Sequence, residues 1–205
     1  SLTAHVLAAK KEIFAQTPVT VVTPSRWLAG EARKSLVFRN CRVEVIPNAV
    51  DTDIFHPREE GVLRKKYAIA PDAVVLKFGS CNNKETRKGF QYLYEAIRLG
   101  LQDERFRNLC DQGKVYIMTT GVHDPSIDGL GIPVKTMGYI ENEEVMAELY
   151  TIADLFLLPS LEDNLPNTML EAMACGTPVI GFDTGGIPDV VDEGCGKIVD
   201  KGDAG

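Results

Sequence analysis

The sequence predicts an α/β fold, with a Rossmann-like open parallel sheet and helices on both of its faces. Two short apolar runs, residues 155–158 and 179–182, have the length and composition of strands buried on both faces of such a sheet. Between them lies a helical stretch that begins at Pro166, which suits the first helical position, and stops at Gly176. Strand, helix and strand in this order form the crossover unit of parallel sheets.

Further helices and strands are expected to alternate along the rest of the chain. The N-terminal part predicts a helix, a strand, a helix that Ser25 can cap, and a strand, over residues 2–15, 20–23, 26–36 and 42–46. The following part predicts helices over residues 61–67, 90–99 and 143–152, and strands over residues 74–78, 115–119, 134–138 and 194–199.

Composition excludes several classes of protein. The net charge of −7 argues against a general nucleic-acid binder. The 5 cysteines show no CxxC or metal-ligand spacing, which indicates reduced thiols in a cytoplasmic protein. The sequence has no signal-peptide pattern, and no apolar run approaches the roughly 18 residues that a membrane span needs. A soluble globular protein is therefore expected.

The loop and helix after residues 155–158 hold the clearest ligand chemistry. In an open α/β sheet, ligands bind beyond the carboxyl ends of the strands. The first turn of a helix offers unpaired N–H groups and a positive dipole end, so those of Asn167 and Thr168 are expected to face a phosphate. Glu171, about one turn further along the same side, can accept two hydrogen bonds from a vicinal diol. With Asp163 in the mouth of the loop, two carboxylates suit a ligand with a central diphosphate and a sugar at each end.

This segment resembles the donor-binding motif of family 4 retaining glycosyltransferases, which have the GT-B fold. The motif is an acidic residue, seven intervening residues, a glutamate and then Ala-Met-Ala-Cys-Gly-Thr-Pro-Val. Here Asp163 is the first acidic residue and Glu171 the second, and residues 172–179 match the rest without a gap. The family usually has glutamate where this chain has Asp163; Glu162, one residue out of step, could compensate.

Two earlier segments resemble the end of the acceptor-binding domain of this family and its interdomain crossing. Residues 23–29, TPSRWLA, are typical of the first, and residues 47–57, PNAVDTDIFHP, of the second. The expected domains are a remnant of the acceptor domain with the interdomain region, 1–47, and a donor-binding domain truncated at its C-terminus, 48–205. Ala49 replaces a usual glycine, so either left-handed backbone is strained there or the turn does not need it.

The resemblance implies further donor contacts. The family holds the donor diphosphate with an arginine at the start of one loop and a lysine, followed by glycine, at its end. Here Lys88 matches the lysine, Ser80 stands in place of the arginine, and Arg87 is expected to take over part of its work. The remaining contacts are expected from the backbone after the third strand of the donor domain, from the motif itself and from a glycine turn: Tyr139, Ile140, Asn164, Leu165, Pro166, Asn167, Thr168, Gly185 and Gly186.

The resemblance implies the donor-binding half of a retaining glycosyltransferase of polysaccharide or glycolipid assembly. The donor is a nucleotide-diphosphate sugar, and Asp163 and Glu171 are the candidate catalytic residues: Glu171 holds the ribose diol and Asp163 orients the transferred sugar. No metal and no separate cofactor are implied. The acceptor glycan or glycolipid would bind the N-terminal domain, and peripheral membrane association is expected of the full-length protein. The 205-residue chain alone is expected to bind nucleotide and transfer little or no sugar.

Two other classes of protein are alternatives to a glycosyltransferase. A dinucleotide-dependent oxidoreductase would have Gly-x-Gly-x-x-Gly after a strand, and the sequence has no such run. A non-catalytic nucleotide-binding or interaction domain with the same fold would account for Ser80 and Asp163 as departures from the family pattern. An assay of the full-length protein for donor hydrolysis or transfer distinguishes this second alternative from a transferase.

Overall fold

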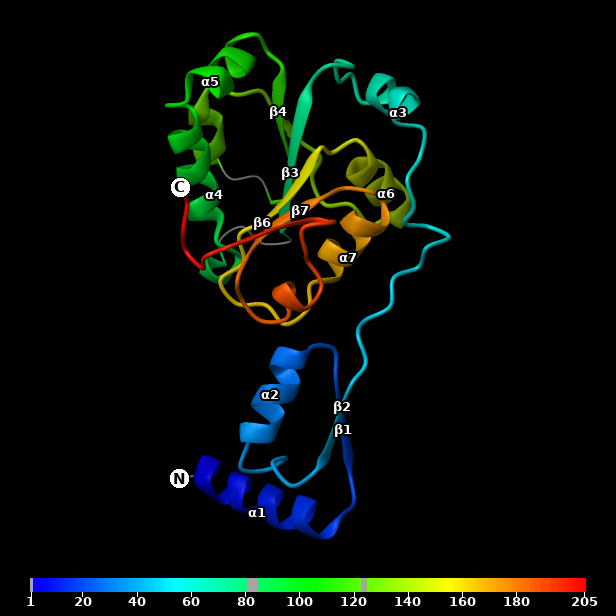
Figure 1. Ribbon diagram of the computed structural model, residues 1–205, viewed down its shortest axis with the longest axis vertical. Coiled ribbons are helices and arrows are strands. Elements are labelled where there is room, and N and C mark those ends of the chain that lie inside the picture. Colours follow the sequence, from blue (N-terminus) through cyan, green and yellow to red (C-terminus); the bar gives the residue numbers. More distant parts are fainter. Residues whose placement is uncertain (1, 81–84, 123–124) are drawn as a thin grey trace.

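The computed structural model describes residues 2–80, 85–122 and 125–205, with only the backbone of Leu2 and Ser80. Figure 1 shows a smaller N-terminal part and a larger part that holds the main sheet, joined by an extended segment. The extended segment begins after β2 (Arg42–Val45) and leads to α3 (Glu60–Lys66). Each part has a sheet of its own.

The smaller part is a two-stranded parallel sheet with two helices. α1 (Leu2–Gln16) precedes β1 (Thr20–Thr23), and α2 (Arg26–Lys34) connects β1 to β2, with Thr20 opposite Arg42. The hydroxyl of Ser25 accepts a hydrogen bond of 3.0 Å from the N–H of Leu28, which satisfies one of the orphan donors at the start of α2. Ser25 therefore caps α2 as its sequence predicts.

The larger part contains a parallel sheet of six strands in the order β5-β4-β3-β6-β7-β8. The chain adds β4 and β5 on one side of β3 and then returns to add β6, β7 and β8 on the other side. The direction of strand addition thus reverses between β3 and β6. Its strands are β3 (Val74–Ser80), β4 (Val115–Gly121), β5 (Val134–Thr136), β6 (Leu155–Leu158), β7 (Val179–Phe182) and β8 (Gly196–Val199).

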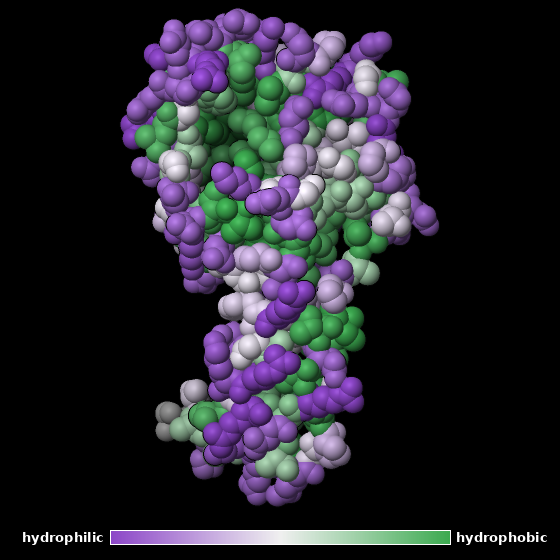
Figure 2. All heavy atoms as spheres, viewed as in Figure 1, coloured by the Kyte–Doolittle hydropathy of each residue, from purple (hydrophilic) through white to green (hydrophobic). Residues whose placement is uncertain are grey.

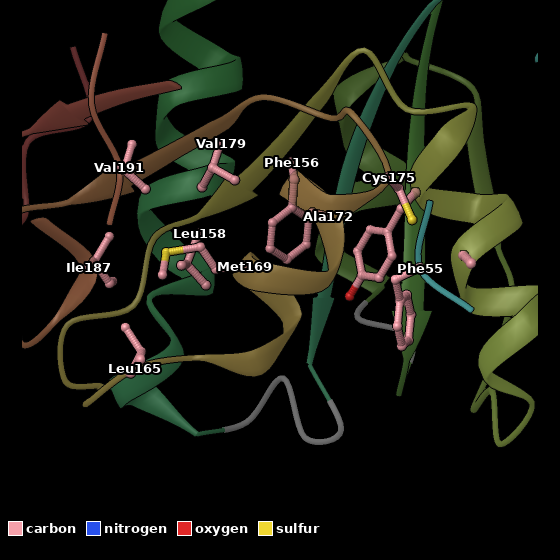
Figure 3. Packing of buried hydrophobic residues seen from close by; sticks show 12 residues of the cluster. Phe55, Phe156, Leu158, Leu165, Met169, Ala172, Cys175, Val179, Ile187 and Val191 are labelled. Carbon is pink, nitrogen blue, oxygen red and sulfur yellow. The ribbon is translucent and has the colours of Figure 1, made fainter. Parts of the chain in front are cut away.

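Helices cover both faces of this sheet (Figure 1). α4 (Phe90–Gly100) and α5 (Glu104–Asp111) lie on one face, where Leu93 and Ile97 pack against Leu76 and Phe78 of β3. α3, α6 (Glu143–Thr151) and α7 (Asn167–Ala174) lie on the other. Figure 3 shows the core under α7, in which Phe156, Leu158, Met169, Ala172 and Val179 pack together. Burial on both faces explains why residues 155–158 are all apolar.

The predicted fold class is confirmed, and most of the predicted elements are found. The strands at 20–23, 155–158 and 179–182 have the predicted bounds. β3 runs two residues further than expected and β5 ends two residues earlier. α5 and three short 3-10 turns, Thr86–Lys88, Pro125–Leu130 and Ile187–Asp189, are additional elements.

Two local predictions are resolved by backbone geometry. Pro166 is the residue before α7 rather than its first residue, with φ −64° and ψ 123°. Among the described residues, Ala68 is the one non-glycine residue with positive φ, at 51°. Ala49 therefore does not adopt a left-handed conformation, and the turn of the crossing segment does not need glycine.

Cys41, Cys110, Cys175 and Cys195 are free thiols. Within residues 2–80, 85–122 and 125–205, no helix combines the length and the apolar character that crossing a membrane requires.

A large hollow lies between α4 and the sheet, with a volume of about 380 Å³. It is the apolar recess visible in the upper part of Figure 2. Leu93 and Ile97 of α4, Leu155 and Leu157 of β6 and Ile180 of β7 line it. A wall of this kind offers no counter-charge to a diphosphate, so this hollow is not the predicted site.

Candidate functional site

A second cavity, of about 250 Å³, lies where the strand order reverses, beyond the carboxyl ends of β3 and β6. In open α/β sheets this reversal is the usual place for a ligand, because the loops of the two strands diverge there. Phe78 and Gly79 of β3 and Leu157 and Leu158 of β6 form its floor. Its polar lining consists of Glu85, Arg87, Lys88, Ser160 and Thr168. The cavity therefore gathers three of the predicted donor contacts, Arg87, Lys88 and Thr168.

The start of α7 faces this cavity through Thr168. α7 has no side-chain cap. In the part of the chain that the structure describes, the N–H groups of Asn167 and Thr168 meet no hydrogen-bond acceptor. The side chain of Asn167 instead accepts a hydrogen bond of 2.9 Å from Asn48 of the crossing segment. Two free N–H groups at a helix start are the arrangement that binds an anion.

Lys88 reaches the site because the backbone of its neighbour is packed tightly against the end of β6. Gly89 has φ 69°, and a Cβ atom there would lie 1.7 Å from the carbonyl oxygen of Pro159. Only glycine fits this contact. The ammonium of Lys88 lies 2.7 Å from Asp163 Oδ2, and the two side chains are 24% and 17% exposed. Two residues predicted to contact different parts of the donor are thus an ion pair.

Arg87 lines the same cavity and forms an ion pair with Glu85. Its guanidinium lies 2.5 Å from Glu85 Oε2 at the surface. Its carbonyl accepts a hydrogen bond of 2.7 Å from the N–H of Leu161. This backbone bond ties the loop after β3 to the loop after β6, so the two walls of the cavity are connected.

Glu171 lies one turn into α7 and is half-buried rather than turned into solvent. The hydroxyl of Tyr150 on α6 donates a hydrogen bond of 3.2 Å to Glu171 Oε2. The ring of Tyr150 lies beneath the ammonium of Lys77, which is 4.4 Å from the ring centroid. These three residues come from α7, α6 and β3, and their contacts link them into one polar chain.

Burial shifts the pKa values of all three residues of this polar chain. Desolvation raises the pKa of Glu171 above its ordinary value, and the nearby Glu143 carboxylate raises it further. The hydrogen bond from Tyr150 and the charge of Lys77 both lower this pKa. Burial lowers the pKa of Lys77 to about 7, and the Glu171 carboxylate opposes that shift. Burial also raises the pKa of Tyr150, so the phenol remains a hydrogen-bond donor.

The glycine turn after β7 packs against the loop of the motif. Gly185 has φ 56°, and a Cβ atom there would lie 1.6 Å from the carbonyl oxygen of Asp163. At Gly186 a Cβ atom would lie 2.4 Å from the carbonyl oxygen of Asn164 and 2.5 Å from Cβ of Ser25. The close approach that these glycines permit is therefore to the chain's own backbone, and a ligand contact there stays a prediction.

Other predicted contacts are not gathered at this cavity. Leu165 and Pro166 are buried, and Leu165 belongs to the core under α7. Tyr139 is 69% exposed beyond β5, and Ile140 packs against the cluster under α6. Asn164 accepts a hydrogen bond of 2.6 Å from Ser25, in the smaller part of the molecule. The side chain of Ser80 lies outside the described atoms, so its predicted contact with the donor stays a prediction.

Lys77 and Tyr150, which link to Glu171, are candidate residues that sequence reasoning missed. Lys77 had a detectable signal, because it is a charge in the middle of an otherwise apolar strand, VVLKF. Tyr150 had none, because a tyrosine near the end of an amphipathic helix is ordinary core material.

The fold and the cavity define the class of α/β proteins that bind ligands at the carboxyl ends of parallel strands. Within that class, the chain belongs to the family described as "Glycosyl transferases group 1", whose model matches residues 72–205. The chain is 31% identical over 172 residues to a D-inositol 3-phosphate glycosyltransferase of Geodermatophilus obscurus, covering 78% of this chain and 37% of the relative. It is 30% identical over 198 residues to an MMP alpha-(1->4)-mannosyltransferase of Mycolicibacterium hassiacum, covering 95% and 44%. The chain therefore spans less than half the length of these relatives.

Solved structures agree with the family. The sucrose-phosphate synthase of Thermosynechococcus elongatus superposes with a TM-score of 0.73 at 25% identity, over 97% of this chain and 49% of that one. HepE of Anabaena, solved in complex with UDP and glucose, superposes with a TM-score of 0.69 at 20% identity, over 97% and 54%. The second likeness supports the fold alone.

Proposed function

We propose that this chain is the donor-binding half of a retaining glycosyltransferase that uses a nucleotide-diphosphate sugar. The observation that carries the proposal is the cavity between β3 and β6, which has Lys88 and Thr168, at the start of α7, in its lining. An ammonium and a helix start are the groups that a diphosphate requires.

In this proposal each part of the donor has a protein partner. Lys88 and the start of α7 hold the diphosphate, with Arg87 at the rim. Glu171 accepts hydrogen bonds from the ribose diol, which its position one turn beyond Thr168 allows. Asp163 orients the transferred sugar once the diphosphate has taken over Lys88. No metal ion takes part, so we expect EDTA to leave donor binding unchanged.

The proposed reaction transfers the sugar from the diphosphate to a hydroxyl of an acceptor glycan or glycolipid. The bond between the anomeric carbon and the terminal phosphate oxygen breaks, the new glycosidic bond forms with retention, and the nucleoside diphosphate and a proton are released. Lys88 and the helix start stabilise the charge that develops on the departing diphosphate. We assign acceptor binding to parts of the whole protein that this chain does not span, and we propose that the chain alone transfers little or no sugar.

Calorimetry of the chain against UDP, GDP and ADP, and against their sugars, tests the proposal. We expect one nucleoside diphosphate to bind and Glu171→Ala to weaken it about tenfold, which is roughly 1.4 kcal/mol. Glu95→Ala is the matched control, because Glu95 is an exposed glutamate of α4. The proposal fails if no nucleoside diphosphate binds, or if Glu171→Ala binds as tightly as the wild type. Transfer by the full-length protein then separates a transferase from a non-catalytic domain.

A further inference from the structure

Lys77 is a charged residue placed where the fold calls for an apolar one. It lies in the middle of β3 and is 1% exposed. Its ammonium donates one long hydrogen bond, of 3.4 Å, to the hydroxyl of Thr120 on β4. Among the residues that the structure describes, no carboxylate forms an ion pair with it. An ammonium has three N–H donors, and within the described part of the chain this is the one hydrogen bond that Lys77 donates.

The fold alone gives no reason for this lysine. Taking an ammonium out of water is unfavourable, and a protein with a hydrophobic side chain of similar volume in such a position is usually at least as stable. The partners of the ammonium are two aromatic rings, Tyr150 at 4.4 Å and Phe156 at 5.4 Å from the ring centroids. Cation–π contacts of this kind offset part of the desolvation cost.

The residues around Lys77 link it to Glu171. β4 contributes Thr120, β6 contributes Phe156, α6 contributes Tyr150 and α7 contributes Glu171. Glu171 is the charged group that opposes the lowered pKa of Lys77, and Tyr150 supplies one of the rings beside the ammonium. The ring under the ammonium belongs to the tyrosine whose hydroxyl donates to Glu171 Oε2 at 3.2 Å. The side chain of Tyr150 thus connects Lys77 to Glu171.

We propose that Lys77 is a positioning residue for Glu171: it fixes the Tyr150 ring and keeps the Glu171 carboxylate ionised and oriented for the ribose diol. The inference rests on the proposed function, because it assigns Glu171 to that diol. A protonated carboxyl loses acceptor capacity, whereas an ionised one can accept both hydroxyls. A positive charge on Lys77 favours the ionised form of Glu171, and because burial lowers the pKa of Lys77 to about 7, this charge is present mainly below neutral pH.

The charges around Glu171 show why a nearby cation matters. Burial raises the pKa of Glu171, and the Glu143 carboxylate on α6 adds to this effect. Cys175, at the end of α7, is a thiol whose pKa burial raises to about 11, so it contributes no charge at neutral pH. Lys77 and the Tyr150 hydroxyl are the groups that favour the ionised carboxylate. Removal of the ammonium leaves the tyrosine hydroxyl alone in that role.

Lys77→Met tests the proposal, because methionine keeps the length of the stem and removes the charge. The pKa of Glu171 is measured by carbon NMR titration, with its signal assigned by its loss in Glu171→Gln. We expect that pKa to rise by about one pH unit in Lys77→Met, and the Kd for the nucleoside diphosphate to rise about tenfold below neutral pH. The melting temperature should stay the same or increase, since a buried charge has been removed.

Lys135→Met is the matched control. Lys135 also lies on a strand beside a tyrosine ring, with its ammonium 5.5 Å from the Tyr116 centroid. It should change neither the Glu171 pKa nor nucleotide affinity. If Lys77→Met does not fold, Lys77→Gln replaces it in both measurements.

The outcomes separate this inference from the proposed function. If the wild type binds no nucleoside diphosphate, the proposed function fails, and with it the role at the diol. If the wild type binds and Glu171→Ala weakens binding, but Lys77→Met binds normally with an unchanged Glu171 pKa, the inference alone is overturned. A raised Glu171 pKa together with weakened binding supports it.

Discussion

The ammonium of Lys88 lies 2.7 Å from Asp163 Oδ2, although 75 positions separate the two residues in the chain. Both are only partly exposed, so solvent screens the pair less than it screens a surface pair. In the proposed function the diphosphate must replace Asp163 as the partner of the Lys88 ammonium. The Asp163 carboxylate that this exchange releases can then bind the transferred sugar. Binding of the diphosphate at Lys88 is thereby coupled to binding of the sugar at Asp163.

The first prediction concerns this exchange. Asp163→Asn removes the competitor for Lys88 and a negative charge beside the phosphates, so the free nucleoside diphosphate should bind about fivefold more tightly, roughly 1 kcal/mol. Lys88→Met should weaken it about tenfold, because a charge-assisted hydrogen bond is lost. Calorimetry with the nucleoside diphosphate measures both effects.

An ion pair outside the site provides the control for this prediction. Lys114 lies 2.8 Å from Asp72 Oδ2 at the surface, and Asp72→Asn should leave nucleotide affinity unchanged. A loss of affinity in Asp163→Asn as large as that in Lys88→Met would show that Asp163 supports the diphosphate directly, contrary to the exchange.

The second prediction concerns the glycine turn. Gly185→Ala combines a left-handed backbone, φ 56°, with a Cβ atom placed 1.6 Å from the carbonyl oxygen of Asp163. The loop of the motif has to move, so we expect a loss of stability above about 2 kcal/mol and a weaker affinity for the nucleotide. Denaturant unfolding and calorimetry measure the two effects.

Gly131→Ala separates backbone strain from the steric clash. Gly131 has φ 71°, and a Cβ atom there would have no neighbour within 4 Å, so alanine should cost only the conformational penalty of about 1 kcal/mol. Equal losses of stability in the two variants would show that the contact with Asp163 contributes nothing.

The sequence predicts those parts of the fold that depend on local pattern. β6 and β7 have their predicted bounds because each is a short apolar run ended by proline or polar residues. α5 is absent from the predicted elements, because its sequence, ERFRNLCD, is short and mostly polar. Its start is nevertheless marked by Asp103, which accepts hydrogen bonds from the N–H groups of Arg105 and Phe106.

The candidate site is predictable only in part. The resemblance to a known motif points to Lys88, Asp163 and Glu171, but no pattern indicates that Lys88 pairs with Asp163 across two loops. The same holds for Tyr150, which meets Glu171 only because α6 packs beside α7. Contacts between distant segments depend on the packing of the sheet and its helices, which a single sequence does not specify.

The third prediction concerns stability and pH. The folded-state pKa of Glu171 lies above its ordinary value of 4.5, so the folded protein binds this proton more tightly than the unfolded chain does. The ionised carboxylate therefore lowers stability at neutral pH. Glu171→Gln should raise the melting temperature there by about 2 °C while it weakens nucleotide binding.

The pH dependence checks the cause of this effect. The advantage of Glu171→Gln should shrink as the pH falls through the raised pKa of Glu171, and it should vanish below the ordinary value of 4.5, where wild-type Glu171 is neutral in both states. Melting curves of both proteins across this pH range provide the measurement. An advantage that does not change with pH would mean that charge is not its origin.

The last prediction tests the hydrogen bond between Tyr150 and Glu171. Tyr150→Phe keeps the ring beneath Lys77 and removes the hydroxyl that donates to Glu171 Oε2 at 3.2 Å. Loss of one hydrogen bond to a charged group should weaken nucleotide binding about tenfold, and it should raise the pKa of Glu171 because that bond favours the ionised form. Tyr67→Phe is the matched control, since the Tyr67 hydroxyl donates to Glu148 at 2.5 Å, away from Glu171. That variant should lose stability and keep its nucleotide affinity. If calorimetry finds the same Kd for Tyr150→Phe and the wild type, the hydroxyl has no part in holding Glu171 toward the ligand, and the orientation of that carboxylate must come from α7 alone.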